Sequence, residues 1–164
     1  MSSTRHGVEI EAEPYEFECS VANTALLIVD MQRDFVSQGG FGEFLGNDVS
    51  AVRDAIQPTQ RVLKTAREVG LPVIYTREGH ESHLADCPPS KQERGRLDVG
   101  IGDEGPMGDV LVRGEDGHEI VPELEPEPED VVIDKPGKGS FYATDLNLIL
   151  QNQAFDLLLS LLLI

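Results

Sequence analysis

Residues 24–40, TALLIVDMQRDFVSQGG, contain the pattern that decides the fold. Apolar residues fill positions 25–29 and lead into Asp30, and a polar turn with Gly39 and Gly40 follows. An uninterrupted apolar run predicts a strand that is buried on both faces of a parallel sheet. Ligands of such sheets bind beyond the carboxyl ends of the strands, so Asp30 would lie at the mouth of a binding site. An equally good interpretation is that Asp30 caps the turn or helix that follows.

A helical repeat and a second apolar run follow this strand. Apolar residues at helical spacing across positions 56–69 predict a helix, for which Pro58 suits the first turn and Gly70 the carboxyl-terminal cap. The run at 71–76 predicts a second buried strand, which ends at Arg77. Strand, helix and strand together predict a βαβ unit, whose crossover is almost always right-handed.

The rest of the chain repeats the pattern after a long excursion. Residues 78–129 are rich in Gly, Pro and charge, and a connection of this length is typical of a lid or a binding loop. Residues 131–134 predict a third strand that ends at Lys135, residues 145–152 a helix, and residues 157–164 a fourth strand. We therefore predict an α/β fold with a doubly wound, mainly parallel sheet.

The composition predicts one globular domain without nucleic-acid or membrane partners. The chain has 164 residues, 40% of them hydrophobic, and no apolar run long enough to span a bilayer. The net charge of -17 repels phosphate backbones and anionic lipid surfaces. We expect residues 1–22 to form an acidic, irregular arm and residues 23–164 the domain. The first residues show no signal pattern, which predicts a cytoplasmic protein.

Charged side chains end all of the first three predicted strands: Asp30, Arg77 and Lys135. If the strands are parallel, the three side chains converge on one rim of the sheet. A lysine beside a carboxylate lowers the pKa of that carboxylate and keeps its own charge, which stores a base beside an electrostatic stabiliser. The alternative is a structural ion pair, and spacing alone does not decide between the two.

Several segments together resemble one enzyme family. TALLIVDMQRDFV at 24–36 and VVIDKPGKGSFYATDLNLIL at 131–150 are similar to the isochorismatase-like cysteine hydrolases. YTREGH at 75–80, GIGDEGP at 100–106 and LVRGEDGHEIVPEL at 111–124 resemble the biuret hydrolase branch. The resemblance implies a doubly wound, Rossmann-type three-layer fold of strand order 3-2-1-4-5-6. It also implies hydrolysis of a C–N bond in a small amide or urea-like substrate such as biuret, and a homo-oligomer in full-length relatives.

The resemblance also implies roles for individual residues. Asp30 matches the catalytic aspartate, the base that takes a proton from a cysteine thiol. Lys135, in the IDKP segment, matches the catalytic lysine that supports the thiolate and the developing charge. Gln32 and Phe35 match the segment that lines the substrate pocket, and Arg77 is a weaker pocket candidate.

The nucleophile of the family has no match in this sequence. The family places its cysteine after the fourth strand in a TGxxTxxC segment, and the sequence stops at Ile164, before any such segment. Cys19 precedes the first strand and Cys87 lies in the long excursion, so we expect both to be ordinary thiols. We therefore expect an incomplete domain that is almost inactive. The alternative is a noncatalytic remnant that binds a small amide or associates with full-length subunits through a bare sheet edge.

We expect neither a cofactor nor a metal. The glycines of GIGDEG at 100–105 do not follow a strand and open a helix, as a dinucleotide fingerprint requires. His80 and His83, close to Asp86 in the sequence, have a spacing that could bind a metal. We interpret both as solvated residues of a charged loop.

Overall fold

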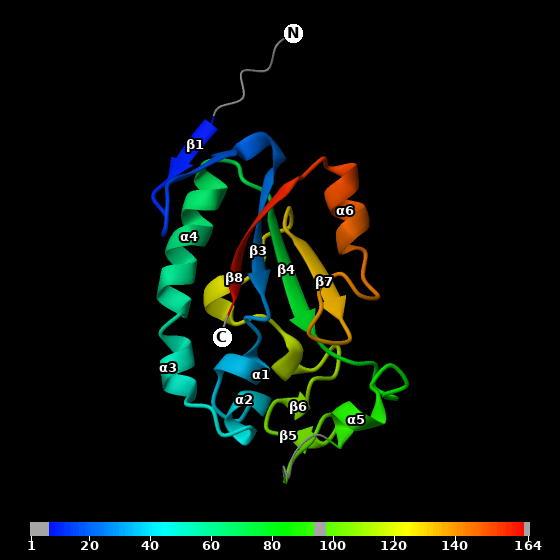
Figure 1. Cartoon of the computed structure of the whole chain (residues 1–164). Helices are drawn as coiled ribbons and strands as arrows, with labels where there is room; N and C mark the ends of the chain where they lie inside the picture. The colour runs from blue at the N-terminus through cyan, green and yellow to red at the C-terminus, as the bar shows by residue number, and fades with distance from the viewer. Residues whose placement is uncertain (1–6, 94–97, 163–164) are drawn as a thin grey trace.

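A four-stranded parallel sheet forms the centre of the computed structural model, which describes residues 7–93 and 98–162. Its strands are β3 (Thr24–Val29), β4 (Val73–Glu78), β7 (Val131–Lys135) and β8 (Leu157–Leu162). They lie side by side in the order β7-β4-β3-β8, and every neighbouring pair is parallel (Figure 1). In chain order this is third, second, first, fourth. The predicted α/β fold with a doubly wound parallel sheet is confirmed.

The central strand β3 is buried along its whole length because helices cover both faces of the sheet. Helix α4 (Ile56–Glu68) lies on one face and α6 (Leu146–Asn152) on the other (Figure 1). Successive residues of a strand point to opposite faces. Leu26 and Ile28 accordingly pack in the cluster that contains α4 residues, and Leu27 and Val29 pack in the cluster that contains α6 residues.

Helix α4 begins and ends close to where its sequence pattern predicts. Gly70 follows the end of the helix with a φ of +74°, a left-handed conformation that glycine adopts without strain. Two of the apolar positions that predicted the helix are nevertheless exposed: Val62 by 43% and Val69 by 52%. These two side chains lie on the wall of a surface groove.

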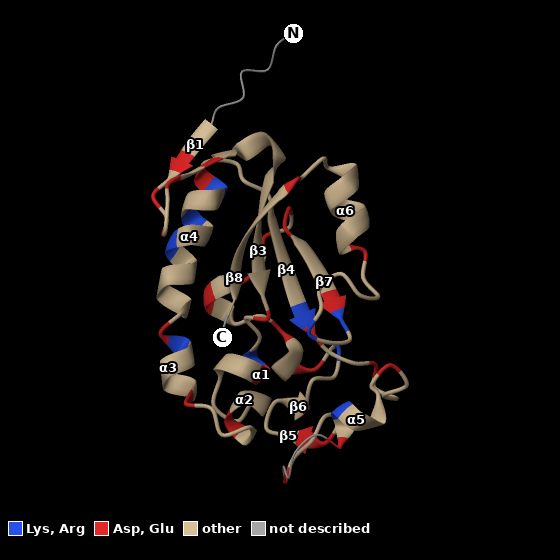
Figure 2. Ribbon diagram, in the orientation of Figure 1, with Lys and Arg blue, Asp and Glu red and all other residues tan. Residues whose placement is uncertain are grey.

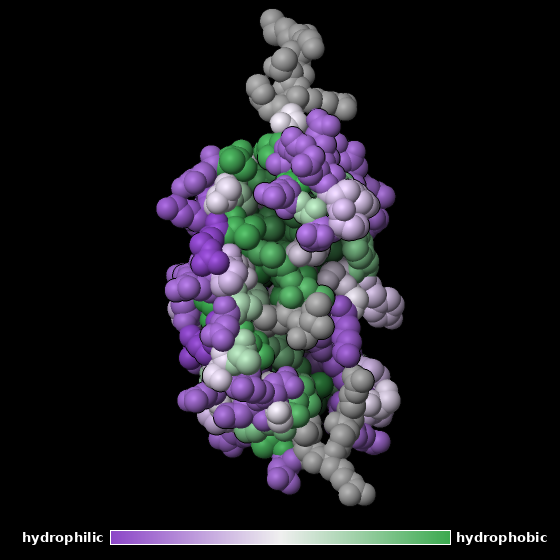
Figure 3. Space-filling view, turned by 60° about the vertical axis from the view of Figure 1, so that its left-hand side comes forward, coloured by the Kyte–Doolittle hydropathy of each residue, from purple (hydrophilic) through white to green (hydrophobic). Residues whose placement is uncertain are grey.

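Residues near the amino terminus form one wall of this groove. Residues 1–22 were expected to form an irregular arm, of which residues 1–6 lie outside the described residues. In the rest, β1 (Gly7–Ile10) and β2 (Phe17–Ser20) form an antiparallel ribbon that leads through the short helix η1 (Val21–Asn23) into β3. Figure 3 shows hydrophobic residues gathered in a hollow on this side of the molecule. We call it the apolar groove, and its lining includes Val8, Ile10, Val62, Val69, Leu159 and Leu161.

Short helices and strands pack beyond the carboxyl ends of the sheet strands. Three short helices follow β3: α1 (Arg33–Val36), α2 (Phe41–Phe44) and α3 (Val49–Arg53). The long excursion contributes α5 (Pro89–Gln92), β5 (Glu104–Gly105), β6 (Gly108–Asp109), η2 (Asp116–His118) and η3 (Pro122–Leu124). No helix within the described ranges is long and apolar enough to cross a membrane.

The excursion is joined to the segment that follows β3 by backbone hydrogen bonds. The N–H of Val121 donates to the carbonyl of Met31 at 2.9 Å, and the N–H of Arg33 donates to the carbonyl of Glu119 at 2.8 Å. A separate apolar cluster that contains Cys87 and Leu111 fills the space beneath the excursion. The excursion is therefore a packed part of the domain, and it lies next to the carboxyl edge of the sheet.

Candidate active site

Asp30 stands directly after β3 in a left-handed conformation with a φ of +53°. Its N–H donates to the carbonyl of Thr76 at 3.0 Å, and its carboxylate accepts a hydrogen bond from the Thr76 hydroxyl at 2.8 Å. Helix α1 has Gln32 as its N-cap residue, so the interpretation of Asp30 as a helix cap is wrong. The backbone instead turns sharply at Asp30 and directs its carboxylate across the end of the sheet.

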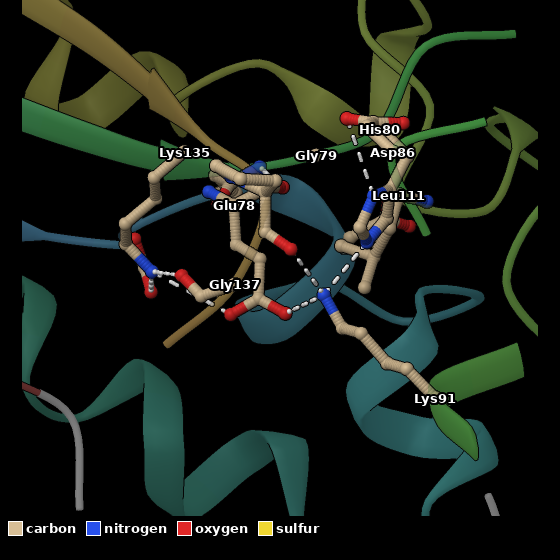
Figure 4. Close-up of polar contacts among 12 residues, drawn as sticks. Glu78, Gly79, His80, Asp86, Lys91, Leu111, Lys135 and Gly137 are labelled. Atoms are coloured by element: carbon tan, nitrogen blue, oxygen red, sulfur yellow. Dashed lines mark hydrogen bonds and ion pairs between the residues drawn. The ribbon is translucent and has the colours of Figure 1, made fainter. Parts of the chain in front are cut away.

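Lys135, the last residue of β7, reaches the same point. Its side chain is fully buried, and its Nζ donates to Asp30 Oδ2 at 2.7 Å and to the carbonyl of Gly137 at 2.8 Å. A third oxygen, Oε2 of Glu78, lies 3.5 Å from the same nitrogen (Figure 4). The structure thus brings the predicted acid and the predicted amine into direct contact.

Arg77 does not join this pair, so the expectation that all three strand-end charges converge is wrong. Thr76 and Glu78 face Asp30 and Lys135, and alternation along β4 turns Arg77 to the opposite face of the sheet. Its guanidinium pairs with Asp134 at 2.8 Å and with Glu119 at 2.7 Å. Figure 2 shows the resulting mixture of positive and negative residues at the ends of β4 and β7. A role for Arg77 in substrate binding stays a prediction.

The two remaining pocket candidates have structural contacts. Gln32 is fully buried, and its amide bonds the backbone N–H and carbonyl of Glu78 and the carbonyl of His118. Phe35, on α1, is half-buried between two apolar clusters. Their contact with a substrate stays a prediction.

Glu78 and Lys91 also belong to this site, although the sequence did not predict them. Lys91 comes from α5 in the long excursion, and its Nζ lies 2.7 Å from Glu78 Oε1, 2.7 Å from His80 Nε2 and 3.1 Å from the carbonyl of Pro136 (Figure 4). Alternation along β4 predicts that Glu78 and Arg77 lie on opposite faces, but the sequence does not show which of them faces the pair. Lys91 had no signal in the sequence.

His80 is fully buried, so its interpretation as a solvated loop residue is wrong, whereas His83 is exposed. Burial, together with the nearby Lys91 ammonium, lowers the pKa of His80 below its usual value. A neutral ring whose Nε2 accepts from Lys91 carries its proton on Nδ1, which faces Asp86 at 3.4 Å. His80 thus acts as an acceptor that helps to hold Lys91.

The pKa values of the two carboxyl groups shift in opposite directions, although both groups are largely removed from water. It raises the pKa of Asp30 above its usual value, although Lys135 and the Thr76 hydroxyl both act in the other direction. Burial also acts to raise the pKa of Glu78, but Lys91 and Lys135 outweigh it, so that this pKa is lowered. Of the two, Asp30 is therefore the better proton acceptor near neutral pH.

Neither cysteine is in contact with this acceptor. Within the described ranges, the hydrogen-bond partners of the Asp30 carboxylate are Lys135 and Thr76. Cys19 lies on β2 beside the apolar groove. Cys87 is buried in the cluster beneath the excursion, and burial raises the pKa of its thiol. A buried thiol with a raised pKa is a poor nucleophile.

Comparison with known proteins identifies the family of this chain. The sequence profile of the isochorismatase domain matches residues 24–160, which include both Asp30 and Lys135. The chain belongs to the isochorismatase family. The ureidoacrylate amidohydrolase RutB of Serratia proteamaculans (strain 568) is 30% identical over 147 residues, which are 87% of this isochorismatase-family chain and 59% of the relative. RutB of Yersinia enterocolitica (strain NCTC 13174 / 8081) is 32% identical over 143 residues, 85% of this chain and 61% of the relative.

Solved structures share the fold of this chain. A cysteine hydrolase from Pseudomonas syringae pv. phaseolicola 1448A superposes with a TM-score of 0.67 at 23% identity, over 88% of this chain and 62% of that one. At this identity the likeness shows the fold. N-carbamoylsarcosine amidase from Thermoplasma acidophilum superposes with a TM-score of 0.60 at 26% identity, over 84% of this chain and 67% of that one. The chain spans about three fifths of the length of the curated relatives that it matches.

Proposed function

We propose that this isochorismatase-family chain provides the base and the lysine of a cysteine-dependent amidohydrolase. Its substrate is a small amide or urea-like compound such as biuret, in which it hydrolyses a C–N bond. The observation that carries the proposal is the contact between the buried Lys135 and the partly buried Asp30 at the carboxyl edge of a parallel sheet. The names of two similar proteins, ureidoacrylate amidohydrolase and N-carbamoylsarcosine amidase, both describe substrates with an N-carbonyl group.

In the proposed reaction Asp30 takes the proton of a cysteine thiol, and the thiolate attacks the carbonyl carbon of the substrate. A C–S bond forms, the C–N bond breaks, and ammonia or an amine leaves with a proton. Water then hydrolyses the acyl-enzyme and restores the thiol. Lys135 stabilises the negative charge on the thiolate and on the carbonyl oxygen. A cytoplasmic location and an oligomeric full-length protein belong to the same proposal.

The positions of Cys19 and Cys87 lead to a specific expectation. Because neither contacts Asp30, we expect the 164-residue chain to release ammonia from biuret no faster than its Asp30→Asn variant does. A rate typical of enzymes, lost in that variant, would instead place the nucleophile within this sequence, and Cys87→Ser would then test the buried thiol.

A chimeric protein tests the proposed chemistry directly. The residues that follow the matching fourth strand in Serratia RutB are joined after Leu162, and ammonia release is measured with biuret and with ureidoacrylate. We expect turnover that falls by about 10³-fold or more when Asp30→Asn or Lys135→Met is introduced. Lys64→Met, on the exposed face of α4, is the matched control. A folded chimera that is inactive on both substrates would contradict the proposal.

The noncatalytic alternative, association with another chain, is favoured by a separate observation. Strand β8 pairs with β3 along one edge, and within the described ranges no strand pairs with its other edge. Residues Leu159 and Leu161 of this strand also line the apolar groove, the hydrophobic hollow of Figure 3. Open edges of this kind pair with further strands. Size-exclusion chromatography across a range of concentrations would show association that Leu161→Lys reduces, whereas a monodisperse monomer would count against it.

A further inference from the structure

The carboxylate of Glu78 lies between two lysines and is shared unequally between them. Its Oε1 is 2.7 Å from Lys91 Nζ, while its Oε2 is 3.5 Å from Lys135 Nζ (Figure 4). Lys135 itself is 2.7 Å from Asp30. Each lysine therefore makes one short contact with a carboxylate, and the longer contact between Glu78 and Lys135 is the one that competes with Asp30.

Lys91 is held where it can draw Glu78 away from Lys135. Its three ammonium protons have three acceptors: Glu78 Oε1, His80 Nε2 and the carbonyl of Pro136. Pro136 directly follows Lys135, and the carbonyl of the next residue, Gly137, accepts from Lys135. The contacts of Lys91 thus fix both the competing carboxylate and the loop that leaves β7.

We propose that Lys91 is a positioning residue, which holds Glu78 and so keeps Lys135 directed at Asp30. The meaning of the Asp30–Lys135 contact for catalysis rests on the function proposed above. The electrostatic coupling from Lys91 through Glu78 to Asp30 is a property of the folded chain and exists without substrate. A residue of the long excursion thereby influences the titration of a residue at the end of β3.

The charged groups around these carboxyls determine what the loss of Lys91 does. Asp30 faces Lys135 and the Thr76 hydroxyl, with Glu78 as its nearby like charge. Glu78 faces Lys91 and Lys135. His80, beside Lys91, also faces Asp86.

Without Lys91, the cation that remains beside Glu78 among these groups is Lys135. Glu78 then competes with Asp30 for Lys135, and the pKa values of both carboxyl groups rise.

The experiment follows the Asp30 carboxyl by carbon-detected NMR during a pH titration of the whole chain labelled with ¹³C-aspartate and ¹³C-glutamate. Lys91→Met is expected to raise the pKa of Asp30 by about one unit, the lower end of the effect of a nearby opposite charge. Lys91→Arg, which keeps the charge, is expected to leave most of the wild-type titration. An Asp30 titration in Lys91→Met that matches the wild type would overturn the proposal.

A second pair of variants separates action through Glu78 from a general loss of structure. In the Glu78→Gln background, Lys91→Met should no longer move the Asp30 titration, because the neutral amide does not compete for Lys135. A shift of equal size in that background would also overturn the proposal. Lys64→Met is the matched control for the loss of one lysine, and it should leave Asp30 unchanged.

Folding and function are tested independently of this coupling. Cooperative thermal unfolding checks that each variant is folded, and Lys91→Gln replaces Lys91→Met if that variant does not fold. Because the titration needs no substrate, it reads the coupling even if the chimera described above is inactive. An active chimera whose Asp30 does not respond to Lys91 would support the proposed function and reject the role of Lys91.

Discussion

The side-chain amide of Gln32 holds the backbone of Glu78 by both of its polar groups. Its Nε2 donates to the carbonyl of Glu78 at 2.9 Å, and its Oε1 accepts from the N–H of Glu78 at 2.7 Å. The same Nε2 also donates to the carbonyl of His118 at 2.9 Å. Gln32 therefore ties the turn after β3 to the end of β4 and to the excursion, and it fixes the point from which the Glu78 carboxylate extends.

Gln32→Ala is expected to destabilise the chain by about 3 kcal/mol. The variant leaves buried backbone groups of Glu78 and His118 without a partner, and each such group costs about 1–3 kcal/mol. Urea unfolding followed by circular dichroism measures the change. Gln57→Ala on the exposed face of α4 is the control and should be close to neutral. Equal stability of the two variants would show that the Gln32 amide is not holding these groups.

Lys135→Met is expected to lower the free energy of unfolding at pH 7 by about 3–5 kcal/mol, because it leaves the buried Glu78 and the partly buried Asp30 without their shared cation. The loss should shrink as the pH falls from 7 to 5. Without the lysine, the folded-state pKa values of Asp30 and Glu78 rise, and a group with a raised folded pKa favours the folded state once it is protonated. Unfolding curves at several pH values check this, and a deficit that does not depend on pH would rule it out.

The buried phenol of Tyr75 is expected to make the folded chain less stable at alkaline pH. Burial raises the pKa of Tyr75 from 10.0 to about 12, so above pH 10 the unfolded chain ionises this phenol while the folded chain keeps it neutral. Between pH 10 and about 12, the free energy of unfolding of the wild type should fall by about 1.4 kcal/mol per pH unit relative to Tyr75→Phe. Below pH 10 the difference between the two proteins should be constant. If the free energies of unfolding of the two proteins differed by a constant amount across the whole pH range, the raised pKa of Tyr75 would be contradicted.

Replacing glycine by alanine is expected to have opposite effects on stability at two positions, Gly79 and Gly137. A Cβ on Gly79 would lie 2.4 Å from Cδ2 of the His118 ring, so Gly79→Ala is expected to cost about 1–3 kcal/mol. A Cβ on Gly137 meets no atom within 4 Å. Gly137→Ala should therefore be neutral or stabilising by up to about 1 kcal/mol, since alanine restricts the unfolded chain. Thermal unfolding of the two variants decides, and similar melting temperatures would speak against the close approach of His118.

The sheet and the Asp30–Lys135 contact could be predicted from the sequence because both depend on local pattern. The apolar run before Asp30 identifies a strand that is buried on both faces, and parallel strands bring their carboxyl ends together. Arg77 shows where this reasoning needs one more step. Strand ends share an edge, but alternation assigns Arg77 and Glu78 to different faces, and the length of the apolar run alone does not reveal which of them faces Asp30.

Lys91 and His80 could not be predicted, because their roles depend on the folding of the excursion. Nothing in the local sequence of α5 distinguishes Lys91 from an exposed lysine, and it contacts Glu78 only because the excursion packs against the carboxyl edge of the sheet. The ribbon of β1 and β2 escaped prediction for a related reason. Its four-residue strands are too short for their alternation to stand out in acidic sequence.

The separation of Asp30 and Lys135 along the chain has a consequence for synthesis on the ribosome. The two residues are 105 positions apart, so at 5–20 residues per second about 5–20 s pass between the addition of the acid and that of its amine. During this interval the carboxylate of the nascent chain stays hydrated, and β3 lacks the charge that neutralises its end when it is buried. We therefore expect the sheet to close over Asp30 only after translation has passed β7, so that β3 completes its docking late in synthesis.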